Sequence, residues 1–313
     1  MKEMNILIKK DLSKEMRDLK KKIKYRCPAV LNDHISGCGA VTAILDTGVM
    51  IHPDLKGRIV GCKDFVNHRE NPYDDNGHGT HIAGIIAGNG VCSNGLYAGI
   101  APESKIVSIK VLDFAGNGKI DDVIQGIQFV LEMQEKWNIR IVNISMGTKK
   151  HGNRADEEEL LNWVERMWDA GMVVITASGN FGPDYGSVTL PGASKKVITV
   201  GACDAMYNKQ RPNINFYSGC GPTDECVIKP DICAPGNHIY SCNFRYPARS
   251  TKPYIAKTGT SMATPVIAGA TALLLQKYPK MGNVEVKMRL WESADDMGLG
   301  ENSQGHGMIN IGK

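Results

Sequence analysis

Between residues 40 and 291 of this 313-residue chain, short apolar segments rich in β-branched residues alternate with segments of helical periodicity. The strand-like segments are 41–45, 106–111, 141–144, 173–176 and 197–200. The helical pattern is clearest over 82–87, 123–137, 160–170, 266–278 and 284–291. Parallel strands need crossover connections, which helices usually supply, and the sheet is then buried on both faces. The alternation therefore predicts an α/β fold, with a doubly wound, mostly parallel sheet and helices on both faces.

Composition and hydropathy exclude several other classes of chain. Hydrophobic residues make up 42% of the sequence and charged residues 22%, which is typical of a globular protein. The longest apolar stretch, 266–275, is about half the ~20 residues that span a bilayer, so we expect no transmembrane segment. Residues 1–10 contain only a three-residue apolar run, which is too short for a signal peptide, and we expect a cytoplasmic protein.

The nine cysteines also favour a reducing compartment. Their number is odd, no CxxC pair occurs, and none of the paired spacings of zinc sites is present. Reduced thiols in the cytoplasm fit this pattern best, because buried cysteines need no partner. The alternative is partial disulfide pairing among Cys220, Cys226, Cys233 and Cys242.

Residues 1–26 differ in charge from the rest of the chain. They contain ten Lys/Arg and four Asp/Glu, whereas the whole chain has a formal net charge of only +4, so residues 27–313 are slightly acidic. A near-neutral body argues against nucleic acid as a partner. Five apolar residues of this extension recur at helical spacing and predict a basic amphipathic helix: Ile8, Leu12, Met16, Leu19 and Ile23. Such a helix fits a regulatory pro-segment, a membrane-surface helix, a docking peptide or a solvated helix packed on the body.

Ligands of doubly wound sheets bind beyond the carboxyl ends of the strands, so the residues that follow each strand are candidates for a site. Asp46 directly follows the apolar run Ala43-Ile44-Leu45. A partly buried acid at this position needs hydrogen bonds or a charged partner. Taken alone, Asp46 is as consistent with capping a turn as with catalysis.

A histidine flanked by glycines opens the next helical segment, in the sequence NGHGTH over residues 76–81. His78 at a helix start can exchange protons near neutral pH if a carboxylate fixes its tautomer. Zinc ligation by His78 and His81 is disfavoured, because their spacing is three rather than four and no glutamate lies between them. We expect His81 to be a satisfied core histidine.

A serine stands near the start of a later helical segment, in the sequence GTSMATP over residues 259–265. The free N–H groups and the dipole of a helix N-terminus favour an oxyanion, and proline is tolerated in the first turn. A serine at such a position is more commonly a cap than a nucleophile. Ser261 therefore gains its significance from Asp46 and His78.

The segments around these residues, AILDTGV, NGHGTHIAG and GTSMATP, resemble the active-site segments of the subtilases, the subtilisin-like serine proteases, and they occur in the subtilisin order Asp, His, Ser. The resemblance extends from about residue 40 to the C-terminus, is greatest to intracellular bacterial members, and implies a sheet of about seven strands. It implies that Ser261 is the nucleophile, His78 the general base and then acid, and Asp46 the group that orients the imidazole. Asn180 would bind the oxyanion together with the Ser261 N–H. Residues 27–313 would then be a catalytic domain that hydrolyses peptide bonds through an acyl-enzyme.

The resemblance also implies where a polypeptide substrate binds. It would run as an extended strand between Gly116-Asn117-Gly118 and Ser145-Met146-Gly147, with Ala177-Ser178-Gly179 on the wall of the primary pocket. Main-chain pairing tolerates many sequences, so broad specificity is expected. Without the triad beside them, the glycines of these segments are also consistent with ordinary turns.

The resemblance implies no cofactor for the chemistry, but structural calcium is common in the family. Asp54, in His52-Pro53-Asp54-Leu55, matches a residue that often binds it. The loop 89–97 contains no acidic side chain, although its carbonyl and Asn oxygens could still serve as ligands, so calcium is expected only as a possibility and without a ligand set.

Two rival functions fit the sequence less well. A catalytically silent pseudoprotease, acting as a binding or regulatory protein, usually lacks a triad member, and none is missing here. A non-proteolytic α/β hydrolase places its serine in a GxSxG elbow, which is absent around Ser261. The stretch 219–257 looks longer than in compact subtilases and has no role that the sequence assigns, and the oligomeric state is not predicted.

Overall fold

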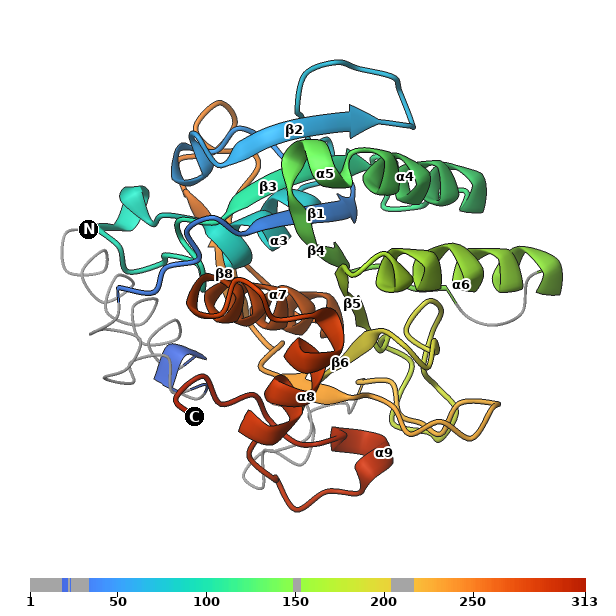
Figure 1. Ribbon diagram of the computed structural model, residues 1–313. Coiled ribbons are helices and arrows are strands. Elements are labelled where there is room, and N and C mark those ends of the chain that lie inside the picture. The colour runs from blue at the N-terminus through green and yellow to red at the C-terminus, as the bar shows by residue number, and fades with distance from the viewer. Residues whose placement is uncertain (1–18, 22, 24–33, 149–152, 204–216) are drawn as a thin grey trace.

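Seven parallel strands form the central sheet of the molecule (Figure 1). The computed structural model describes residues 19–21, 23, 34–148, 153–203 and 217–313. The strands are β1 (Val41–Asp46), β2 (Ile59–Asp64), β3 (Lys105–Lys110), β4 (Ile139–Ile144), β5 (Val173–Ala177), β6 (Ile198–Ala202) and β7 (Ile232–Ala234), and their order in the sheet is β2-β3-β1-β4-β5-β6-β7. Every neighbouring pair is parallel, which confirms the predicted sheet. The winding reverses between β1 and β4, the point at which such sheets bind ligands.

Helices cover both faces of the sheet. On one face α4 (Ile120–Glu132) contacts α6 (Arg154–Asp169), and on the other α3 (His78–Ala87) contacts α7 (Thr260–Lys277), as Figure 1 shows. The remaining described helices are α5 (Gln134–Trp137), α8 (Asn283–Ser293), α9 (Glu301–Gln304) and the 3-10 turns η1 (Pro53–Leu55) and η2 (Val91–Ser93). Helix α7 is buried on nearly all sides, in agreement with its apolar sequence. In the described ranges, no helix has both the length and the hydropathy to cross a membrane.

Two strands of the main sheet and one helix differ from the sequence prediction. Strand β2 was not predicted because it is an edge strand with several partly exposed side chains. Strand β7 was not predicted because it has only three residues, in a segment that prolines interrupt on both sides. The helix predicted over 123–137 is in fact two helices, since α4 ends before Met133 and α5 begins after it.

The stretch 219–257, to which the sequence assigns no role, contains an antiparallel hairpin. Its strands are β8 (Ile239–Cys242) and β9 (Tyr254–Lys257). Strand β8 packs against α3, the helix that begins at His78. The hairpin therefore supports the back of a helix that carries a candidate catalytic residue.

Only a small part of the N-terminal extension lies among the described residues. Leu19 and Ile23 are buried, and the carbonyl of Ile23 accepts a hydrogen bond of 3.0 Å from the amide of Ile311. These two members of the predicted apolar face thus pack on the body beside the C-terminal segment (Figure 1). Ile8, Leu12 and Met16 lie outside the described residues.

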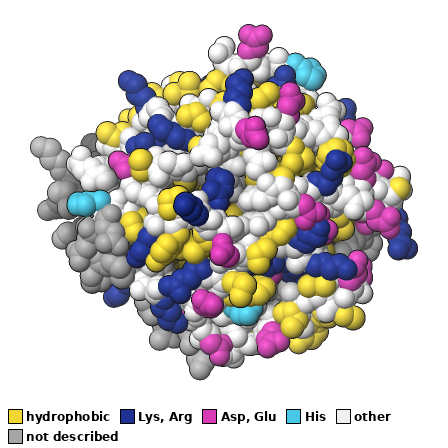
Figure 2. Space-filling view, in the orientation of Figure 1, with side chains coloured by type: hydrophobic (Ala, Val, Ile, Leu, Met, Phe, Trp, Pro, Cys, Tyr) yellow, Lys and Arg dark blue, Asp and Glu magenta, His cyan; other side chains and the backbone are white. Residues whose placement is uncertain are grey.

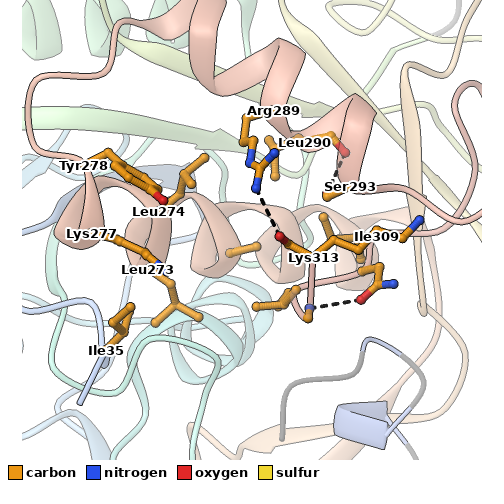
Figure 3. Close-up of a pocket in the computed structure, with 14 residues that line it drawn as sticks. Ile35, Leu273, Leu274, Lys277, Tyr278, Arg289, Leu290, Ser293, Ile309 and Lys313 are labelled. Atoms are coloured by element: carbon orange, nitrogen blue, oxygen red, sulfur yellow. Dashed lines mark hydrogen bonds between the residues drawn. The ribbon is translucent and has the colours of Figure 1, made fainter. Parts of the chain in front are cut away.

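The C-terminal segment closes over α7 and α8 and leaves a cavity of about 110 Å³ (Figure 3). Arg289 donates a hydrogen bond of 3.0 Å to the carbonyl of Lys313 at its mouth. The cavity is lined mainly by apolar side chains, among them Leu273, Leu290 and Ile309, and contains none of the predicted site residues.

No disulfide joins any of the eight cysteines within the described ranges. The alternative of pairing among Cys220, Cys226, Cys233 and Cys242 is therefore not realised in the structure. Cys27 lies outside the described residues.

Candidate active site

Asp46 is the last residue of β1, at the carboxyl end of an interior strand of the sheet. Its side chain is fully buried, and Oδ1 accepts a hydrogen bond of 2.7 Å from the amide of Thr47. A buried carboxylate is stable only with such donors or with a charged partner. The position of Asp46 is therefore fixed by the strand and by the turn that follows it.

His78 is the first residue of α3 and lies directly against Asp46. Its Nδ1 is 2.8 Å from Oδ1 and 2.9 Å from Oδ2 of Asp46, so the ring donates its Nδ1–H to the carboxylate. The side chain of His78 is 24% exposed, whereas that of Asp46 is buried. Gly79 makes this approach possible, because a Cβ there would lie 2.1 Å from the carbonyl oxygen of Gly48. The arrangement leaves Nε2 of His78 as the proton acceptor.

The loop before His78 is held by a second buried carboxylate, which the sequence analysis missed. Asp74 accepts hydrogen bonds from the amides of Asn76, Gly77 and Thr80 and from the hydroxyls of Thr47 and Thr80. Burial raises the pKa of Asp74, and these donors act in the opposite direction. The Thr47 hydroxyl in turn accepts a hydrogen bond from the amide of Gly79. Asp74 thus joins the turn after β1 to the start of α3.

A buried lysine on β3, also missed, ties the same turn to the following loop. Lys110 is only 2% exposed, and its ammonium donates to the carbonyls of Thr47 and Leu112 and to the carboxylate of Asp75. A lysine inside an apolar strand run is buried only if all its donors are used. No local pattern distinguishes it from a solvated lysine, so tertiary structure was needed to find it.

Ser261 is the second residue of α7 and is partly exposed. The N-terminus of this helix is tied to Asn180, whose Oδ1 accepts hydrogen bonds of 2.9 and 3.0 Å from the amide and hydroxyl of Thr260. These contacts orient the amide of Asn180 so that Oδ1 faces the helix, and Nδ2 is left to donate elsewhere. First-turn amides such as that of Ser261 have no intrahelical acceptor. Two N–H donors therefore lie beside the predicted nucleophile, as an oxyanion requires.

Five of the predicted substrate-binding residues line a cavity of about 250 Å³: Gly116, Asn117, Gly118, Met146 and Gly147. The remaining lining is mainly apolar: Leu112, Ile120, Val123, Ile144, Leu160, Val164, Leu190 and Pro191, with Thr148. In the part of the chain that the structure describes, no hydrogen bond engages the main chain of Gly118 or Gly147. Two segments with open main-chain groups thus border one apolar cavity.

The other predicted substrate-binding residues lie close to this cavity but do not line it. Ser145 is buried, and its hydroxyl accepts a hydrogen bond of 2.8 Å from Asn143. Ala177, Ser178 and Gly179 follow or end β5 and lead directly to Asn180. The carbonyl of Ser178 accepts a hydrogen bond from the amide of Thr189, and that of Gly179 accepts one from Gly219, so internal contacts occupy both carbonyls.

The second histidine of α3 lies in the core as expected, but it is only half satisfied, because its buried Nδ1 has no hydrogen-bond partner among the described residues. His81 is fully buried, and its Nε2 lies 3.0 Å from the carbonyl oxygens of Ile239 and Ile255 in the β8–β9 hairpin. Burial lowers the pKa of His81 to about 3, so it is neutral near pH 7. His81 therefore anchors the hairpin to α3.

The surroundings of Asp54 do not fit calcium. Asp54 is fully buried, and its oxygens accept hydrogen bonds from the Tyr254 hydroxyl (2.7 Å) and the Cys92 amide (3.0 Å). The neighbouring ligand atoms come from His52 and Cys242. Calcium prefers six to eight oxygen ligands, whereas two of these three side chains offer nitrogen or sulfur.

Comparisons with known proteins agree with the geometry. The profile of the Subtilase family matches residues 37–307. The chain is 40% identical over 275 residues to "Serine protease AprX" of Bacillus subtilis (strain 168), covering 83% of this chain but only 62% of AprX. It is 34% identical over 288 residues to "Subtilisin Savinase" of Lederbergia lenta, covering 92% of this chain and 94% of Savinase.

Solved structures show the same fold. "S41 Psychrophilic Protease" superposes with a TM-score of 0.74 at 32% identity, covering 88% of this chain and 92% of that one. "Sphericase" superposes with a TM-score of 0.73 at 28% identity, over the same shares of the two chains.

Proposed function

The chain belongs to the Subtilase family and is a serine endopeptidase, and on this premise we propose that it uses Asp46, His78 and Ser261 to cleave polypeptides bound as extended strands. The observation that carries the proposal is the contact between both oxygens of Asp46 and Nδ1 of a partly exposed His78. This contact fixes the tautomer in which Nε2 accepts a proton. Ser261 stands at the N-terminus of the helix that packs against α3.

In the proposed mechanism, Nε2 of His78 takes the hydroxyl proton of Ser261 as the oxygen attacks the substrate carbonyl. The buried Asp46 carboxylate stabilises the imidazolium that forms. The oxyanion accepts hydrogen bonds from Nδ2 of Asn180 and from the amide of Ser261. His78 then returns the proton to the leaving amine, and a water molecule that His78 activates hydrolyses the acyl-enzyme.

We propose broad specificity with one apolar preference. Open main-chain groups at Gly118 and Gly147 support pairing with a substrate strand on both sides, which is independent of side-chain identity. The cavity between them is large enough for a substrate side chain and is lined mainly by apolar residues. A bulky apolar side chain of the substrate would fill it, with Ser145, Ala177, Ser178 and Gly179 bordering the rest of the path.

The cellular setting is also a proposal. Free thiols at exposed positions such as Cys38 and Cys226 support a reducing, cytoplasmic location. Basic and acidic side chains are interspersed on the face shown in Figure 2, which supports polypeptides rather than nucleic acid as partners. We further infer that residues 1–26 form an extension to a catalytic domain of residues 27–313.

The test is intact-mass analysis after reaction with a fluorophosphonate, which labels only an activated serine. We expect one adduct on the wild-type protein and none on Ser261→Ala, with casein cleavage lost in parallel. Circular dichroism of both proteins controls for folding. Absence of an adduct on folded wild-type protein would refute the triad and favour the pseudoprotease.

A further inference from the structure

A second cluster of reactive side chains lies where η1 and β8 pack against α3. It consists of His52, Asp54 and Cys242, whose nearest ligand atoms all lie within 4.8 Å of one another. The first two flank the start of the η1 turn, and the third ends strand β8. All three side chains are buried, with at most 1% exposure. The active-site chemistry uses none of them.

The three side chains are already oriented by outer contacts. Nε2 of His52 lies 3.0 Å from the carbonyl oxygen of Pro253, so it carries the proton and Nδ1 keeps a lone pair. The Asp54 carboxylate accepts hydrogen bonds from the Tyr254 hydroxyl and the Cys92 amide, with further lone pairs left on both oxygens. A histidine bound to a carbonyl and a carboxylate held by donors are typical of the outer shell of a metal site.

The charge around the cluster also suits a cation. None of the salt bridges found among the described residues involves Asp54, whose charge therefore has no cationic side chain to balance it.

Cys92, on the η2 turn, offers a further thiol beside Asp54. Its thiol is hydrogen-bonded to Asp54. The side chain is only partly buried. Solvent can therefore reach the cluster from this side, which gives an ion a path of entry.

We propose that Nδ1 of His52, an Asp54 oxygen and the Cys242 sulfur bind zinc or another thiophilic divalent cation, with Cys92 as the fourth ligand. One nitrogen, one oxygen and two sulfur donors match the four-coordinate preference of zinc. Binding releases the two thiol protons to solvent, since each sulfur binds as a thiolate. Nδ1 gives up the 3.1 Å hydrogen bond that it accepts from the Asp54 amide.

Such an ion would join η1, η2 and the β8–β9 hairpin behind α3. Cys242 packs directly against this helix, because a Cβ on Gly84 would lie 2.7 Å from the Cys242 sulfur. We therefore expect the ion to stabilise the folded chain, since a ligand that binds only the folded state shifts unfolding by mass action. The ion takes no part in peptide hydrolysis.

The probe is cadmium, whose bonds to thiolates give an ultraviolet charge-transfer band. Titration of the full-length protein, reduced and metal-free, should show a band that saturates at one equivalent and a rise in the unfolding temperature. Both should be lost in Cys242→Ser. In His52→Asn and Cys92→Ser, the affinity for cadmium should fall at least tenfold. The matched control is Cys38→Ser, which removes an exposed thiol and should behave as wild type.

A band of undiminished height in Cys242→Ser would overturn the proposal, because the cadmium would then bind elsewhere. Fluorophosphonate labelling of Ser261 shows whether that variant is folded. If the variant is not folded, X-ray absorption spectroscopy of the zinc-loaded wild-type protein tests the site instead. Two sulfur neighbours at about 2.3 Å and two N/O neighbours at about 2.0 Å support the site, and N/O neighbours alone refute it.

Discussion

The chain contains two histidine–aspartate pairs close together in sequence, and they differ in which atoms of the ring are left available. In the pair at the active site, Nδ1 of His78 donates to the Asp46 carboxylate, and the ring is partly exposed. In the pair behind α3, Nδ1 of His52 accepts from the main-chain amide of Asp54, and Nε2 donates to a carbonyl. The second ring is fully buried.

The difference shows that the free nitrogen, and not the residue pair, determines the role. Within the described residues no hydrogen bond engages Nε2 of His78, which therefore can exchange protons with a nucleophile and a leaving group. Main-chain groups bind both nitrogens of His52, so it can act only as a structural anchor or, after losing one hydrogen bond, as a metal ligand.

Replacing each of the two histidines by alanine should give the largest difference between the pairs. His78→Ala should lower kcat by about 10⁶-fold, the loss known for the general base of subtilisin, without a comparable loss of stability. His52→Ala should act mainly on the unfolding temperature, because it removes a buried ring with two hydrogen bonds. Peptide hydrolysis and thermal unfolding of both variants provide the measurement. A large kcat loss in His52→Ala at full folding would show that the two pairs are coupled.

The carboxylate of the active pair is the next test. Asp46→Asn should lower kcat by about 10⁴-fold, since the amide can no longer hold the imidazole in the required tautomer or stabilise its charged form. Substrate KM should change little, because Asp46 is buried and lies outside the cavity that borders the substrate path. Steady-state kinetics on a chromogenic peptide separate the two constants. A loss confined to KM would contradict the assigned role.

A third comparison concerns His78 and His81, one turn apart on α3. The pKa of His81 is about 3 in the folded chain, below the usual 6.5 expected after unfolding. Between these values only the unfolded chain binds the proton, so stability falls as pH decreases from about 6.5 to about 3, by up to ~1.4 kcal/mol per pH unit. His81→Gln, which keeps an N–H donor for the two carbonyls, should show a shallower fall. Denaturant unfolding of both proteins at several pH values provides the test, and equal slopes would contradict it.

The sequence predicted the central strands because β-branched apolar runs such as 173–176 have no other stable place than a buried sheet. The resemblance of three segments to those of the subtilases predicted one site for Asp46, His78 and Ser261, and the structure brings Asp46 and His78 into contact. The sequence analysis missed Asp74 and Lys110, because a charged side chain in a loop or at a strand end looks solvated until tertiary contacts bury it. The cluster at His52 was missed for the same reason, since its members come from three separate segments.

The smallest expected effect concerns the loop before His78. Asp74 holds this loop with five accepted hydrogen bonds from backbone and hydroxyl donors. Asp74→Asn keeps the shape but replaces one acceptor oxygen with an NH₂ group, which leaves at least one buried donor unsatisfied. We expect a loss of about 1–3 kcal/mol in the free energy of unfolding.

The same change should lower kcat less than Asp46→Asn does, because Asp74 acts on His78 only through the turn that carries it. Denaturant unfolding and kcat are measured together, with Asp75→Asn as the control, since Asp75 is partly exposed and contacts Lys110 instead. A kcat loss in Asp74→Asn that equals that of Asp46→Asn would mean that the loop, and not the carboxylate at Nδ1, sets the position of the base. The two histidine–aspartate pairs would then differ in their supporting loops more than in their free nitrogens.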